Sequence, residues 1–389
     1  MLKRRIWKLL CCFLLMTSCL FPLTTAAAAE SAQKESNEAC VASIKMISTE
    51  NDSLPVASRE PLLLLEQPCG KSSLEGLTVI PGGMPFGIKF YTEGVTVVGF
   101  CDVETTEGTV NPARAAGLKQ KDMILKVNGK PLSGASDLTD QIEKSEGKPL
   151  TLFCRRGKTE LEIKLTPAYC PAEARYKTGI WVRDSGAGIG TVTFIIPETG
   201  AFAGLGHGIC DADTGELVPM KRGTVLDVTV SAVVKGEAGA PGELKGYFKP
   251  GKTGSMISNT DCGVYGVFTP CPTDIKPIPI GLKGELREGE AHILCTLDEG
   301  GTIGKYSVSI SNINRSAQGG KCFTVKITDP ALLSKTGGIV QGMSGSPIIQ
   351  NGKLVGAVTH VMINDPTTGY GIFIENMLSA ADAPMARAA

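Results

Sequence analysis

The sequence has little of several features that would point directly to a function. Its 39 basic residues balance 39 acidic ones, which argues against a nucleic-acid-binding protein, because such proteins usually carry a basic excess or stripe. Its cysteines form no CxxC pair and no other paired-ligand spacing, so a zinc site has little support. We therefore expect no metal ion, no other cofactor and no nucleic-acid partner.

Long runs with helical periodicity are also scarce. Most apolar segments are short or alternating, and Gly, Pro, Asn or Asp separates them; the 389 residues include 47 glycines and 23 prolines. This pattern is typical of short strands joined by turns. No repeat of fixed period is visible. The composition predicts a mainly β protein, and the length suits two domains.

The N-terminal segment has the layout of an export signal. Basic residues 3–5 precede an apolar stretch over residues 6–23, and small residues follow at 26–29. We interpret residues 1–29 as a signal peptide. The apolar stretch is nearly long enough for an uncleaved membrane anchor, and Cys19 leaves lipidation as a third interpretation. All three place the remaining chain outside the cytoplasm, where disulfides can form, but nothing indicates which cysteines would pair.

Residues 30–73 are polar and irregular, and three prolines interrupt them. We predict an exposed linker there, which is a natural site for proteolysis. Residues 74–168 are predicted to form one compact unit. It contains a tight turn at Asn128–Gly129, a helix capped by Ser136 and a hairpin that turns at Gly157.

The phrase ARAAGLKQKDMILKVNGKPL in this unit resembles the PDZ-domain family. The resemblance implies a peptide-binding loop at Pro85–Ile88, in which successive backbone N–H groups cradle the terminal carboxylate of a peptide. Phe86, Gly87 and Ile88 are the residues that this loop would contribute. The peptide would then add as a strand beside residues 88–91.

Residues 175–380 contain many short strands, for which a closed barrel or a sandwich is predicted. Near their end, the heptad QGMSGSP fits the pattern of chymotrypsin-like serine proteases. Small neighbours leave room for an acyl carbon at Ser344, and the N–H groups of Gly342 and Ser344 can point together at an oxyanion. Ser346 is interpreted as a packing or turn residue.

A serine hydroxyl is a weak nucleophile until a base takes its proton, and the chain has only three histidines. His207 lies between glycines in GLGHGICD, which leaves its ring reachable, and it is the preferred base. His360 ends the strand after the serine motif and is the second candidate. His292 lies in an alternating strand and is interpreted as structural.

A third group should orient the imidazole, and it is usually a carboxylate. Asp329 ends a strand shortly before the serine, where a carboxylate can be held. The same position, followed by Pro330, also suits the N-cap of a short helix. Spacing alone does not separate Asp329 from the other aspartates, notably Asp211 and Asp365; Asp213, Asp227 and Asp261 also remain open.

The PDZ-like unit, GLGHGICD and the long block ITDPALLSKTGGIVQGMSGSPIIQNGKLVGAVTH resemble the SpoIVB family of sporulation peptidases over essentially the whole chain. The resemblance implies a chymotrypsin-like β-barrel peptidase domain over residues 175–380. It places the family's catalytic residues on His207, Asp329 and Ser344.

The same resemblance implies a biological role. Such peptidases cross the inner forespore membrane into the space between the two forespore membranes, free or anchored by the N-terminal segment. There they cleave themselves and then cut a membrane-bound regulator of an intramembrane protease, which activates a mother-cell sigma factor. A catalytically silent PDZ adaptor is the alternative, and cysteine chemistry at Cys210 beside His207 is a weaker one.

Overall fold

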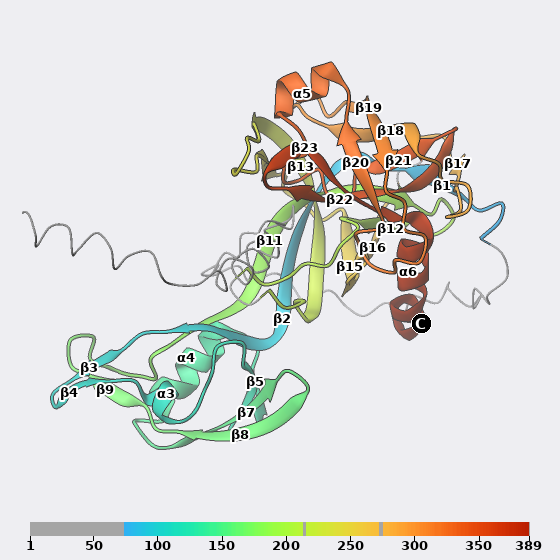
Figure 1. Cartoon of the computed structure of the whole chain (residues 1–389). Helices are drawn as coiled ribbons and strands as arrows, with labels where there is room; N and C mark the ends of the chain where they lie inside the picture. Colours follow the sequence, from blue (N-terminus) through green and yellow to red (C-terminus); the bar gives the residue numbers. More distant parts are fainter. Residues whose placement is uncertain (1–73, 213–214, 272–274, 389) are drawn as a thin grey trace, which may run out of the picture. The chain divides into compact units, whose positions relative to one another are not determined.

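The computed structural model describes residues 74–388 apart from 213–214 and 272–274. Strands dominate this part of the chain, which confirms the mainly β prediction (Figure 1). The predicted signal segment, residues 1–29, and the predicted linker, residues 30–73, lie outside the described residues. Across the described ranges, no helix is both long and apolar enough to cross a bilayer.

A small unit (cyan to green in Figure 1) surrounds one of the hydrophobic cores. The helix α4 covers this core with Leu138 and Ile142, an i, i+4 apolar pair on one face. Asn128 and Gly129 both have positive φ, as the predicted tight turn requires. The elements are β3 (Val103–Thr105), β4 (Gly108–Val110), α3 (Pro112–Ala115), β5 (Met123–Val127), β6 (Lys130–Pro131), α4 (Ala135–Lys144), β7 (Leu150–Arg156), β8 (Thr159–Leu165), β9 (Ala168–Cys170) and β10 (Arg175–Lys177).

The start of α4 differs from the prediction. Gly134 occupies the N-cap and has no side chain that could bond the first turn, so Ser136 lies inside the helix rather than at its cap. The side chain of Asp184 supplies the missing acceptor, because the Ala135 N–H donates to its Oδ2 at 2.7 Å. A long-range carboxylate therefore replaces the local cap, which the sequence pattern could not indicate.

Two long antiparallel strands, β2 (Pro85–Phe100) and β11 (Ile180–Ile195), continue from the small unit into a larger sheet. At one end of the pair, Phe100 and Ile180 are opposite each other and pack against the core of the small unit. At the other end, Phe86 and Val192 belong to a second core. The two strands therefore serve both cores.

The second core is enclosed by a ring of strands. Strand β2 pairs with β11 on one side and with β13 on the other, and β12, β16 and β15 complete the circuit. Strands β1 and β17 continue the sheet outside this ring, and β14 pairs with β13. The bounds are β1 (Thr78–Pro81), β12 (Ala201–Gly204), β13 (Met220–Val234), β14 (Glu243–Phe248), β15 (Gly254–Thr260), β16 (Gly263–Phe268) and β17 (Ile278–Pro279).

A second closed barrel (orange to red in Figure 1) follows in the order β18-β19-β20-β23-β22-β21. The predicted hairpin at Asn351–Gly352 joins two of its strands, with Gln350 opposite Lys353. The elements of this part are β18 (Gly289–Thr296), β19 (Ile303–Ser311), β20 (Phe323–Ile327), α5 (Pro330–Thr336), β21 (Pro347–Gln350), β22 (Lys353–Met362), β23 (Asp365–Phe373) and α6 (Ile374–Ala388).

The predicted peptide-binding loop at Phe86, Gly87 and Ile88 is wrong. These residues lie inside β2, where Gly87 is opposite Ile189 of β11 and Leu226 of β13. Phe86 and Ile88 are each 1% exposed. Both edges of this stretch are paired, so no peptide can add there as a strand. The small unit accordingly begins within β2 rather than at residue 74, because residues 85–90 pack in the second core.

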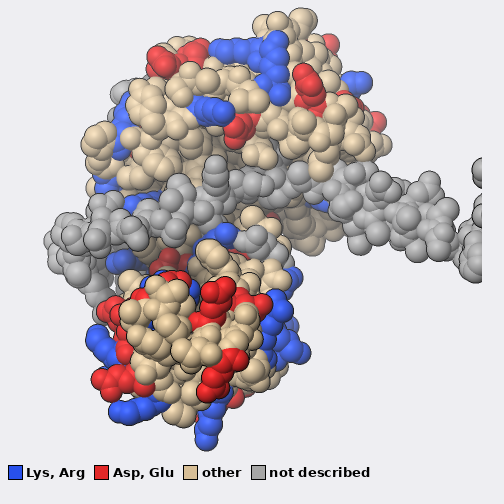
Figure 2. Space-filling model, turned by 90° about the vertical axis from the view of Figure 1, so that its left-hand side faces the viewer, with Lys and Arg blue, Asp and Glu red and all other residues tan. Residues whose placement is uncertain are grey.

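The surface carries both signs of charge. Figure 2 shows lysine and arginine side chains interspersed with aspartate and glutamate side chains on the face turned to the viewer. One carboxylate is fully buried: Asp122, 0% exposed, binds the Arg156 guanidinium at 2.6 Å through each oxygen. This paired geometry offsets the cost of burying the charge. Cys154, Cys170, Cys295 and Cys322 are buried free thiols.

Candidate active site

The segment that carries His207 follows β12 through a sharp turn. Leu205 and Gly206 both have positive φ, +66° and +70°. A side chain on Gly206 would lie 2.9 Å from the Thr359 methyl group, so glycine permits the close approach of this turn to β22. The turn brings His207, 3% exposed, from the first ring of strands to the second barrel.

Ser344 lies in a glycine-rich loop between α5 and β21, which we call the nucleophile loop (residues 341–346). Gly342 and Gly345 have φ values of +97° and +92°, which favour glycine. A Cβ on Gly345 would also overlap the carbonyl oxygen of Thr191 in β11. The small residues of the motif are therefore needed for backbone contact as well as for substrate access.

The structure brings His207 and Ser344 together. The imidazole Nε2 lies 3.0 Å from the Ser344 Oγ, and Nδ1 lies 2.9 Å from the Gly208 carbonyl oxygen. A proton on Nδ1 can be donated to that carbonyl, which leaves Nε2 as an acceptor for the serine proton. The Ser344 hydroxyl also lies 2.8 Å from the Thr359 carbonyl oxygen, so its single proton has two competing acceptors.

Burial controls the charge of the imidazole. Removal from water lowers the pKa of His207 to about 4, although the hydrogen bond with Gly208 acts in the opposite direction. The ring is therefore neutral at pH 7 and can accept a proton. Ser344 itself is 0% exposed, so the reactive pair lies below the surface in this state.

His360, the second candidate for the base, is the neighbour of His207 and not the partner of the serine. The two imidazole rings are 5.0 Å apart between centroids. Burial, then the proximity of His207 and Lys321, lowers the pKa of His360 to about 3. Its Nδ1 is buried without a hydrogen-bond partner among the residues described. The preference for His207 as the residue beside Ser344 agrees with this geometry.

The structure does not bring Asp329 to this pair. Its Oδ1 accepts hydrogen bonds from the N–H groups of Ala331 and Leu332 at 3.0 and 3.1 Å, and its Oδ2 accepts one from Ser307 at 3.2 Å. Asp329 is the N-cap of α5, as the alternative interpretation of the sequence proposed. The geometry thus corrects its assignment as the residue that orients His207.

Of the other candidate aspartates, Asp227 and Asp261 are exposed, whereas Asp211 and Asp365 have side-chain partners. Asp211 is buried and lies 3.3 Å from the Arg183 guanidinium. Asp365 accepts hydrogen bonds from Thr367 and Thr368. Asp213 lies outside the described residues. The sequence analysis did not predict the two backbone carbonyls at this site, those of Gly208 and Thr359. Every residue type has a backbone carbonyl, so the sequence cannot show which ones accept hydrogen bonds.

The predicted oxyanion donors are available. Within the described part of the chain, the N–H groups of Gly342 and Ser344 donate to no acceptor. An oxyanion that forms at Ser344 could take these hydrogen bonds. No cluster of possible metal ligands exists among the described side chains.

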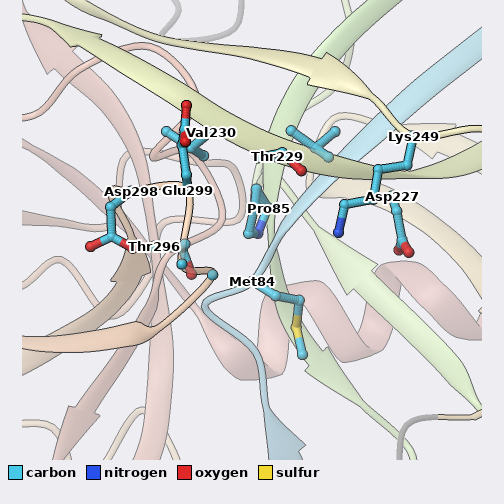
Figure 3. A pocket seen from close by; sticks show the side chains of 12 residues that line it. Met84, Pro85, Asp227, Thr229, Val230, Lys249, Thr296, Asp298 and Glu299 are labelled. Atoms are coloured by element: carbon cyan, nitrogen blue, oxygen red, sulfur yellow. The ribbon is translucent and has the colours of Figure 1, made fainter.

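A separate cavity of about 230 Å³ lies beside the start of β2 (Figure 3). Three carboxylates and one lysine line it, but Asp227 and Asp298 lie on opposite sides of the labelled group in Figure 3. Thr296 lies between them, and its hydroxyl donates to the Gly83 carbonyl at 3.1 Å. The cavity holds neither His207 nor Ser344 and is not the reactive site.

One family model matches the part of the chain that contains this site. The family model described as SpoIVB peptidase S55 matches residues 174–378. The chain belongs to this family. The family is described as one of peptidases, and both His207 and Ser344 lie within the matched range.

Curated proteins and solved structures also match parts of the chain. The chain is 45% identical to the serine protease HTRA1 of Xenopus tropicalis over 56 residues, which are 14% of this chain and 12% of that protein. A solved structure of the HtrA-type protease AlgW with a decapeptide matches 54% of this chain and 55% of that one, at 12% identity and a TM-score of 0.32. The PDZ domain of the SdrC-like protein from Listeria monocytogenes matches 23% of this chain and 87% of that one, at 19% identity and a TM-score of 0.19.

Proposed function

We propose that this serine peptidase is an exported endopeptidase that cleaves itself and then a membrane-bound regulator during endospore formation. The observation that carries the peptidase chemistry is the 3.0 Å contact between the His207 Nε2 and the Ser344 Oγ. Membership of the SpoIVB peptidase family supports the sporulation role.

The proposed reaction uses atoms that the structure places together. Ser344 Oγ attacks the scissile carbonyl while Nε2 of His207 takes its proton and later gives it to the leaving amine. The Gly208 carbonyl holds Nδ1 and so fixes the tautomer. The N–H groups of Gly342 and Ser344 bind the oxyanion, and water then hydrolyses the acyl-enzyme.

The substrates and the location belong to the same proposal. Residues 1–29 have the layout of an export signal, and residues 30–73 have the polar, proline-interrupted sequence of a linker that proteases cut. We infer that the enzyme acts in the space between the two forespore membranes. Its second substrate there would be a membrane-bound regulator of an intramembrane protease.

Replacement of the nucleophile tests this proposal. We expect that Ser344→Ala abolishes cleavage, while circular dichroism stays unchanged, because only a buried hydroxyl is removed. Purified protein is incubated and its new N-termini are sequenced. Ser316→Ala, which removes an exposed hydroxyl, serves as the matched control and should cleave normally. Cleavage that persists in purified Ser344→Ala would contradict the assignment.

The silent adaptor is the second candidate function. Its predicted peptide-binding loop is buried in a paired strand, which weakens it. A fluorophosphonate probe distinguishes the two functions, because it labels an activated serine and no other hydroxyl at a comparable rate. A folded sample without any label on Ser344 would favour the adaptor.

A further inference from the structure

Strand β11 lies directly against the nucleophile loop. The side chain of Thr191, a residue that is 2% exposed, donates a hydrogen bond of 2.7 Å from Oγ1 to the Gly342 carbonyl. The backbone N–H of Thr191 donates to the Ser344 carbonyl at 3.0 Å. A single residue of β11 therefore holds both residues that carry the oxyanion donors.

Thr191 is also joined to the histidine segment. Its carbonyl oxygen accepts a hydrogen bond of 3.3 Å from the N–H of Leu205, two residues before His207. The same carbonyl lies so close to Gly345 that no side chain would fit on that glycine. Thr191 thus connects β11, the nucleophile loop and the segment that carries the base.

A second buried threonine of β11 binds the nucleophile loop in the same way as Thr191. Thr191 and Thr193 are alternate residues of β11 whose hydroxyls both bind the nucleophile loop, whereas Val192 between them packs in the second core. Thr193, 0% exposed, donates from Oγ1 to the Gly345 carbonyl at 2.8 Å. A buried hydroxyl is costly unless it forms a hydrogen bond, and both of these bond the carbonyls of the nucleophile loop.

These bonds bear on the oxyanion donors through peptide geometry. The Ser344 N–H belongs to the peptide group that follows Met343. Thr191 fixes the peptide groups on both sides of it, because it binds the carbonyl of Gly342 and the carbonyl of Ser344. Gly342 has no side chain to restrict its rotation and has φ +97°. The Thr191 hydroxyl therefore supplies a restraint that the glycine lacks.

We propose that Thr191 is a positioning residue for the oxyanion site, acting through its hydroxyl on the Gly342 carbonyl. It touches no substrate, and the proposal rests on the peptidase function proposed above. Without the hydroxyl, the Gly342–Met343 peptide group keeps only the hydrogen bond from the Met343 N–H to the Val340 carbonyl at 3.1 Å, and the N–H of Ser344 points less steadily at the oxyanion.

Isosteric substitution tests this role. Thr191→Val keeps the shape and removes the hydroxyl, Thr191→Ser keeps the hydroxyl, and Thr296→Val is the control, because Thr296 is equally buried and its hydroxyl also binds a glycine carbonyl. The full chain is assayed with dye-labelled casein for kcat and KM, and with a fluorophosphonate for the labelling rate of Ser344. Loss of one oxyanion donor typically lowers kcat about 10²–10³-fold. For Thr191→Val we expect a fall of about tenfold to hundredfold in kcat and in labelling, with KM unchanged.

Thr191→Ser and Thr296→Val should stay within about threefold of the wild type. Wild-type kcat in Thr191→Val would overturn the proposal. Equal losses in Thr191→Ser and Thr191→Val would also overturn it, because the hydroxyl that Thr191→Ser keeps would then not preserve activity. If Thr191→Val does not fold, Thr191→Ser is compared with Thr191→Ala, since both lack the methyl group and only one keeps the hydroxyl. A wild type no more active than Ser344→Ala would instead refute the peptidase function, and the role of Thr191 with it.

Discussion

At the scale of single residues, the motif around the serine and the glycines around the histidine were sufficient to predict that His207 and Ser344 lie together. His207 and Ser344 are 137 positions apart in the sequence and 3.0 Å apart between Nε2 and Oγ. The sequence could not indicate which group binds the second ring nitrogen of the imidazole, Nδ1. That partner is the Gly208 carbonyl, and every residue type offers the same carbonyl group.

The buried imidazole leads to a prediction about pH. Because the pKa of His207 is lowered from 6.5 to about 4, the base stays unprotonated down to that pH. We expect the acidic limb of kcat/KM, measured between about pH 3.5 and 8, to fall near pH 4. A limb near 6.5 would show that the imidazole is solvated in the active enzyme.

Stability must be followed in the same experiment. The unfolded chain binds a proton at this histidine below pH 6.5, while the folded chain does not bind one until about pH 4. The contribution of this histidine to the free energy of unfolding is therefore fully present above pH 6.5. It is lost as the pH falls from 6.5 to about 4, by at most about 1.4 kcal/mol per pH unit. Circular dichroism at each pH separates unfolding from protonation of the base.

At the scale of secondary structure, the two Asn-Gly turns were predicted correctly and the peptide-binding loop was not. The tight turns at Asn128–Gly129 and Asn351–Gly352 were predicted correctly, because their positive φ values require particular residues. The stretch Pro85–Ile88 was assigned to a peptide-binding loop, yet it is the beginning of β2 and is paired on both sides. A short apolar run with a glycine suits either structure, and only its two paired neighbours distinguish them.

Helix α5 provides the test for Asp329. In Asp329→Ala the N–H groups of Ala331 and Leu332 lose their acceptor, which should lower the free energy of unfolding by about 1 kcal/mol. We expect kcat of the folded variant to remain within about tenfold of the wild type. Urea denaturation and casein hydrolysis measure the two effects, and Asp261→Ala, at an exposed position, is the control. A loss of several hundredfold in kcat would restore the catalytic role that the family resemblance implies.

At the scale of the whole described region, a mainly β chain with a closed barrel could be predicted, but the pairing of its strands could not. The closure of the first ring depends on β2 contacting both β11 and β13, and such distant pairings are not encoded in any local stretch. For the same reason the boundary of the small unit was predicted too early. Strands that belong to two cores have no break in composition where one core ends.

The shared strands predict cooperative unfolding. Trp181 lies on β11 in the small unit, whereas most strands lie in the ring and the barrel. If β2 and β11 couple these parts, the thermal transition followed by tryptophan fluorescence should coincide with the one followed by far-UV circular dichroism. An earlier fluorescence transition would mean that the small unit unfolds alone. Trp181→Phe, which removes the fluorescent group, is the control that assigns the signal to this position.

The complete burial of Ser344 bears on how unwanted cleavage of other proteins would be prevented. Proteins that merely collide with the molecule cannot reach its reactive oxygen. Under the proposed function, a substrate would be cut only after neighbouring residues had moved to expose the Ser344 hydroxyl. Substrates would then be selected in two steps. The first is the movement that exposes Ser344, and the second is the fit of the scissile bond to the site.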